Sequence, residues 1–134
     1  MEKIAFEQLF TQRALRELFP HERADLFFEG LYGDPLEGAY DISLVFKGQD
    51  RDTLQFEFRL EQRPGKCLAC NLTYGLPEVF SRHPIINIKG LIREIDQMLG
   101  GQWRCDGWRL GLTREVSREL HILPLLITIA KRDF

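Results

Sequence analysis

The chain has 134 residues, of which 44% are hydrophobic, 11% aromatic and 28% charged. This is the composition of an ordinary globular protein and excludes a disordered or fibrous chain. Since a typical domain holds ~150 residues, we expect residues 1–134 to form a single α+β domain. The formal net charge of −2 argues against bulk attraction to nucleic acid or to an anionic membrane surface.

No membrane-spanning or secretory segment is expected. The longest nearly apolar run, residues 122–130, is far shorter than the ~18 residues that a membrane span needs, so it predicts a strand. The N-terminal residues lack the basic, then apolar, then small pattern of a secretory signal. Three cysteines are an odd number, which favours free thiols in a reducing compartment. We therefore expect a cytoplasmic protein.

Apolar residues at helical spacing predict two short helices in the first quarter of the chain. The first runs to Phe19 and ends at Pro20, which cannot continue the helical hydrogen bonds. The second begins at Pro20 and ends at Gly33. The apolar positions are Phe6, Leu9, Phe10, Ala14 and Leu18 in the first helix and Ala24, Phe27, Phe28 and Leu31 in the second.

Alternating residues then predict three strands, at 40–46, 54–60 and 68–74, joined by polar turns at 47–52 and 63–66. We expect them to form an antiparallel meander with one solvated face. Residues 75–84 contain Gly75, Pro77 and Pro84 and predict a long connection. An amphipathic helix follows at 88–99, capped by Asn87 and ended by Gly100-Gly101, and we expect it to pack on the sheet.

Residues 103–110 predict a tight hairpin around Asp106-Gly107, with a single strand bulged at Gly107 as the alternative. The hairpin would place Arg104 opposite Arg109, a like-charge pair. Residues 120–130 predict a last strand. The fold class is therefore α+β, an antiparallel sheet of about five to six strands with helices on one face, in the order α-α-β-β-β-α-β-β(-β). This order, though no residue motif, resembles that of small dimeric α/β domains of the secretion-chaperone type.

A metal site is the sharpest chemical hypothesis. Cys67 and Cys70 have C-x-x-C spacing and His83 follows, which resembles the first part of a zinc-finger pattern. The pattern lacks the second histidine, because Asn87, Ile88 and Lys89 occupy the positions where it is required. Cys105 could complete the site only through a tertiary contact. The alternative interpretation, which we favour, is that Cys70 is a small core residue and Cys67 a half-exposed thiol.

Other site motifs are missing from the sequence. There is no phosphate-binding loop, no G-x-S-x-G elbow and no paired carboxylates in apolar surroundings, so we expect a non-catalytic protein without a cofactor. His121 is expected on the solvated face of the last strand or satisfied by a hydrogen bond. Basic and aromatic residues between 103 and 118 could bind nucleic acid, but the tryptophans fall on the predicted core face, so we do not expect it. These residues are Trp103, Arg104, Trp108, Arg109, Arg114 and Arg118.

Apolar residues outnumber those needed to cover one sheet face. The excess predicts a self-complementary interface or a groove for a partner's apolar segment, whereas the alternative is that the last strand is central and covered twice. The candidate partner-binding residues are Phe6, Phe10, Val79, Phe80 and Ile85. We therefore expect a homodimeric protein-interaction or chaperone-like module that holds another protein with its first helix, its 76–86 segment or a sheet edge. The alternative is a small-ligand or zinc-binding domain using Cys67, Cys70, His83 and Cys105.

Overall fold

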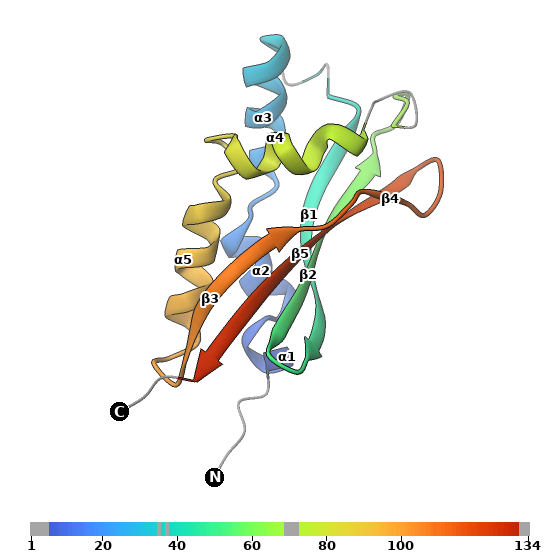
Figure 1. The fold of residues 1–134 in the computed structure, drawn as a ribbon. Helices are drawn as coiled ribbons and strands as arrows, with labels where there is room; N and C mark the ends of the chain where they lie inside the picture. Colours follow the sequence, from blue (N-terminus) through green and yellow to red (C-terminus); the bar gives the residue numbers. More distant parts are fainter. Residues whose placement is uncertain (1–5, 35, 37, 69–72, 132–134) are drawn as a thin grey trace.

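The computed structural model shows an α+β protein whose helices gather on one side of an antiparallel sheet (Figure 1). It describes residues 6–34, 36, 38–68 and 73–131. These residues form five α-helices and a five-stranded sheet. No helix in these ranges is long and apolar enough to cross a membrane.

The first quarter of the chain forms three helices: α1 (Phe6–Leu9), α2 (Gln12–Leu18) and α3 (Glu22–Tyr32). The first predicted helix is split because Thr11 is extended and its side chain accepts a hydrogen bond from the backbone N–H of Ala14 at 3.2 Å, which starts α2 anew. Gly33 ends α3 as predicted, with a positive φ of 79° that suits glycine.

The sheet has the strand order β1-β2-β5-β3, with β4 also pairing with β5. Its strands are β1 (Tyr40–Asp50), β2 (Thr53–Gln62), β3 (Trp103–Leu110), β4 (Arg114–Glu115) and β5 (Leu120–Lys131). The predicted hairpin of β1 and β2 is confirmed, with Tyr40 opposite Gln62 and a register shift between Phe46 and Gly48. The last strand is central, between β2 and β3.

The predicted third strand of the meander is wrong. The second edge of β2 pairs with β5 over nine consecutive positions, from Thr53 opposite Thr128 to Glu61 opposite Leu120. Thr73–Gly75 form a short 3-10 helix instead, and residues 69–72 lie outside the described ranges. The predicted connection that follows contains α4 (Leu76–Arg82), whose proline lies in the first turn, where its missing N–H leaves no helical bond unmade.

The predicted amphipathic helix is confirmed as α5 (Ile88–Met98), which the Asn87 side chain caps. The predicted hairpin around Asp106-Gly107 is wrong and the bulged alternative is correct. All of β3 pairs with β5, and the register shifts between Cys105 and Gly107. A single strand separates Arg104 from Arg109 along its length, which avoids the like-charge pair that the hairpin would create.

One face of the sheet is buried beneath the helices and the other remains partly exposed. Along β5, Leu123, Leu125, Ile127 and Ile129 are buried, whereas the alternating Pro124, Leu126, Thr128 and Ala130 are half-buried. The last strand is therefore central, as the second alternative predicted, but helices cover only one of its faces. Side chains from all five helices and from β1, β2 and β5 form one hydrophobic core.

Candidate interaction edge

Strand β1 lies at one edge of the sheet, and within the described residues its only strand partner is β2. The backbone N–H of Arg63 donates to the carbonyl of Ala39 at 2.9 Å, in the same register as the hairpin. Because antiparallel ladders alternate bonded and non-bonded pairs, Asp41, Ser43 and Val45 bond to β2. Residues 40, 42, 44 and 46 therefore direct their backbone N–H and C=O groups toward the outer edge.

A groove of about 400 Å³ runs beside this edge, between α2 and β1. Leu15 and Phe19 line its helix side, and Ser43, Leu44 and Val45 line its strand side. The apolar part is rigid, because the buried ring of Phe19 packs edge-on against Phe58 with centroids 5.3 Å apart. An added strand could thus find both unpaired backbone groups and an apolar wall at one place.

Charged side chains complete the rim of the groove. Arg59 and Glu61 reach it from β2, and the Arg59 Nε lies 3.5 Å from the Glu61 carboxylate. This Nε is buried, and its contact with Glu61 does not satisfy hydrogen-bond geometry, so the donor has no hydrogen-bond partner among the described residues. A buried donor without a partner carries a desolvation cost. The exposed part of the Arg59 side chain and the Glu61 carboxylate make this rim of the groove charged.

The opposite edge of the sheet, formed by β3, is bonded to α5 at one position. The backbone N–H of Cys105 donates to the Asp96 carboxylate of α5 at 2.8 Å. The Cys105 thiol lies 3.9 Å from the carbonyl of Ile92 in the same helix. Burial, and secondarily the charge of Asp96, raises the pKa of the Cys105 thiol to about 11. This cysteine is therefore a poor nucleophile, and its strand is covered by α5.

The four candidate metal ligands are not brought together within the described residues. Cys67 is disulfide-bonded, so the expectation of a free thiol is wrong there, whereas it is confirmed for Cys105. Cys70 lies outside the described ranges. His83 follows α4, where its ring packs against Phe27 with centroids 4.8 Å apart. Among the residues that are described, no three metal-ligating side chains cluster; the zinc site stays a prediction.

The five candidate partner-binding residues separate into two groups. Phe6, Phe10 and Phe80 are buried in the core and do not lie on the surface. Val79 is 37% exposed and Ile85 is half-buried. The sequence alone could not distinguish the buried group from the exposed one, because an apolar residue on a short helix does not indicate how deeply that helix is buried.

The remaining residues considered as site candidates are His121 and the tryptophans and arginines of β3. His121 is fully buried rather than solvated, and the other expected alternative, a hydrogen-bonded side chain, is confirmed at Nδ1, which lies 2.8 Å from the Thr73 hydroxyl. Trp103 and Trp108 are half-buried against the core, while Arg104 and Arg109 are exposed on the opposite face of β3. The basic and aromatic residues therefore do not share one surface that could stack bases and follow phosphates.

The chain matches no protein-family model, no curated protein and no solved structure. The fold thus defines the class, an α+β protein with helices on one side of an antiparallel sheet, and the function is argued from the site alone.

Proposed function

We propose that this protein is an interaction module that binds an extended polypeptide segment by strand addition to β1. The observation that carries the proposal is the outward set of backbone groups at Ile42, Leu44 and Phe46 beside the α2 groove. In strand addition, main-chain hydrogen bonds supply affinity, and pockets for alternate side chains supply specificity.

The groove indicates what kind of segment fits. Alternate side chains of an added strand point to opposite faces of the sheet. On the helix side they would contact Leu15 and Phe19, which suits apolar residues. On the other side they would meet the charged groups of Arg59 and Glu61, which suits polar residues. The preferred segment therefore alternates apolar residues with polar residues.

Other surfaces support binding less well. A groove of about 430 Å³ lies between α2 and α5, lined in part by Glu17, Glu94 and Met98. Backbone groups inside helices are already bonded, so this groove offers side-chain contacts alone. At the β3 edge, the backbone N–H of Cys105 is already bonded to Asp96. Strand β1 is the described element that combines free main-chain groups with an apolar wall.

A peptide selection tests the proposal. Random peptides displayed on phage are selected for binding to the protein at low protein concentration. The amide hydrogen exchange of the protein is then measured with and without a selected peptide. We expect binders with alternating apolar residues that slow exchange at Ile42 and Leu44. Selected peptides that leave the exchange of β1 unchanged would overturn the proposal.

A matched pair of variants locates the site. Lysines on an edge strand prevent strand addition, so Ser43→Lys with Val45→Lys is expected to weaken peptide binding at least about tenfold. The control is Thr53→Lys with Gln55→Lys, which places the same charges at half-buried positions on the same sheet face, on β2. Equal binding by the two double variants would contradict the assignment to β1.

A further inference from the structure

We propose that the segment bound at this edge is β1 of a second copy, paired antiparallel about a twofold axis at Leu44. The inference rests on the proposed function, because it uses the same edge, and it names the occupant. Two copies would then share one continuous sheet with β1 strands at its centre. Pairing identical edges about a twofold axis is self-complementary and closes the assembly at two copies.

Hydrogen bonding restricts how the two strands can meet. Within residues 40–46, the even-numbered residues direct their backbone groups outward, so even-numbered residues must pair with even-numbered ones. A twofold axis at Leu44 satisfies this condition, since Leu44 then faces itself and Ile42 faces Phe46 of the second copy. Other registers that shift by two residues satisfy it as well, so a further observation must choose among them.

Charge complementarity chooses the register. On the open face of the sheet, β1 carries Asp41 at one end and Lys47 at the other. With the axis at Leu44, Asp41 lies opposite Lys47 of the second copy, and the symmetry repeats this pair. Moving the axis by one residue, to Ser43, places Asp41 opposite Val45 instead. Opposite charges directly across an antiparallel pair are stabilising.

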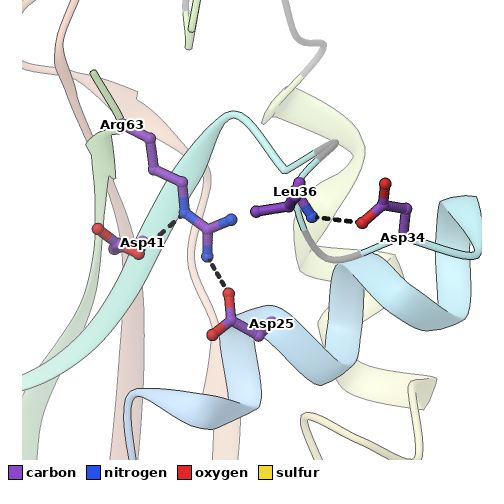
Figure 2. A network of polar contacts seen from close by, with 5 residues as sticks. All are labelled: Asp25, Asp34, Leu36, Asp41 and Arg63. Atoms are coloured by element: carbon purple, nitrogen blue, oxygen red, sulfur yellow. Dashed lines mark hydrogen bonds and ion pairs between the residues drawn. The ribbon is translucent and has the colours of Figure 1, made fainter. Parts of the chain in front are cut away.

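Both charged side chains are accessible. The Nε of Arg63 lies 3.0 Å from the Asp41 carboxylate (Figure 2). The Asp41 side chain nevertheless remains 60% exposed. Lys47 is exposed at the register shift between Phe46 and Gly48. Because a bulge interrupts regular pairing, the regular shared ladder ends at Phe46, and Lys47 lies one residue beyond it, beside Asp41 of the second copy. A slide toward the C-terminal end of β1 would place the bulge inside the ladder, so the bulge also opposes other registers.

The groove fits this arrangement. Helix α2 packs on β1 and forms the wall beside Ser43, Leu44 and Val45, which are centred on the proposed axis. The twofold operation therefore brings the α2 helices of both copies toward each other on the helix side of the sheet. Leu15 and Phe19, which are already buried in each copy, would lie beside the junction.

The test measures the oligomeric state of the full chain by sedimentation velocity over a range of concentrations. We expect a dimer whose dissociation constant rises by about tenfold or more in Lys47→Glu, because two attractive pairs become repulsive. Lys89→Glu is the control, since it makes the same charge change at an exposed position on α5. Equal effects of the two variants would overturn the inference.

A charge exchange provides a second readout that a folding defect would not reproduce. Asp41→Lys alone is expected to weaken the dimer, because the introduced ammonium group would face Lys47 of the second copy. In an equimolar mixture of the Lys47→Glu and Asp41→Lys variants, the heterodimer has opposite charges in both pairs, Asp41 with Lys47 and Glu at position 47 with Lys at position 41. We expect this mixture to form a heterodimer tighter than either homodimer, and a mixture that stays monomeric would contradict the register.

The two proposals fail in different ways. A protein that is monomeric at the highest concentration reached, but binds selected peptides at β1, overturns the second copy as occupant and supports strand addition. A dimer that is insensitive to Lys47→Glu and to the double lysine variant of β1, with no peptide binding at that edge, overturns both. A dimer that selected peptides dissociate supports both.

Discussion

The carboxylate of Asp96 accepts a hydrogen bond from the backbone N–H of Cys105 at 2.8 Å. This bond joins α5 to the outer edge of β3 and occupies a main-chain donor that would otherwise be open to strand addition. The two edges of the sheet therefore differ: a helix side chain bonds the β3 edge at Cys105, whereas β1 has a groove beside its edge.

Removing this carboxylate should destabilise the protein. Asp96→Ala leaves the part-buried Cys105 N–H without its acceptor, so we expect the free energy of unfolding to fall by about 1–2 kcal/mol. Urea denaturation measures it. The control is Asp106→Ala, because Asp106 is 49% exposed and forms an ion pair with Arg104 at 2.9 Å; such surface pairs contribute about 0–1 kcal/mol. An Asp96→Ala loss no larger than the control's would refute the role of this bond.

Arg63, which follows β2, joins two other elements and is only 16% exposed (Figure 2). It contacts Asp25 of α3 at 2.7 Å and Asp41 of β1 at 3.0 Å, and its guanidinium lies 5.3 Å from the ring centre of Phe28. We expect Arg63→Ala to cost about 1–3 kcal/mol of stability. Arg63→Lys should recover only part of this loss, because an ammonium group lacks the planar fork of donors.

The matched control for Arg63 is Arg13→Ala. Arg13 is 92% exposed and lies 3.8 Å from the Glu17 carboxylate one helical turn away. Exposed pairs of this spacing contribute about 0.3–0.5 kcal/mol. Thermal unfolding of the three variants should rank Arg63→Ala as the least stable, followed by Arg63→Lys and then Arg13→Ala. Any other order would count against the network.

The buried Thr73 hydroxyl is the hydrogen-bond partner of the Nδ1 atom of His121. The Nε2 atom of the same ring is buried and has no hydrogen-bond partner among the described residues. Thr73→Val keeps the side-chain shape but leaves Nδ1 unpaired as well, so we expect a loss of about 1–3 kcal/mol. Thr53→Val is the control, since Thr53 is half-buried and its hydroxyl makes a weak 3.4 Å contact with Asp52. Similar urea midpoints for the two variants would show that the buried bond contributes nothing.

Alkaline pH should destabilise the protein through Tyr40. Burial, and then the nearby charge of Tyr32, raises the pKa of Tyr40 above its ordinary value. In the unfolded chain tyrosine ionises near pH ~10, so the folded state binds the proton more tightly. This contribution to stability is complete below pH ~10 and is lost as the pH rises toward the folded-state pKa.

Tyr40→Phe tests that dependence, because phenylalanine keeps the ring that packs against Phe28 with centroids 4.8 Å apart. The free energy of unfolding is measured for both proteins on either side of pH ~10. The native protein should lose more stability than the variant across this interval. Parallel pH profiles would show that Tyr40 does not contribute.

Local features of the fold were predictable because they depend on neighbours in the chain. The alternation in residues 40–46 and 54–60 predicted the β1–β2 hairpin, and the period of the apolar residues between Ile88 and Leu99 predicted α5. Gly33 predicted the end of α3, since few other residues adopt its backbone conformation. Each of these signals lies within one turn or one strand.

The errors concern contacts between distant segments. The alternation in residues 68–74 is as suitable for a strand as that in β5, but β2 has only one free edge after the hairpin forms, and β5 occupies it. The pattern around Asp106-Gly107 suits both a turn and a bulge, and pairing with β5 decides for the bulge. The burial of Phe6, Phe10 and Phe80 likewise follows from the packing of separate elements.

The amino-acid sequence by itself determined most of the strands and helices and which face of each is apolar, because side-chain periodicity is a property of consecutive residues. Only the tertiary structure decided which strand is left at a free edge, with Ile42 and Leu44 directing their backbone groups beside the α2 groove. Every strand has the same main-chain donors and acceptors, so the free edge depends on which partners the rest of the chain supplies.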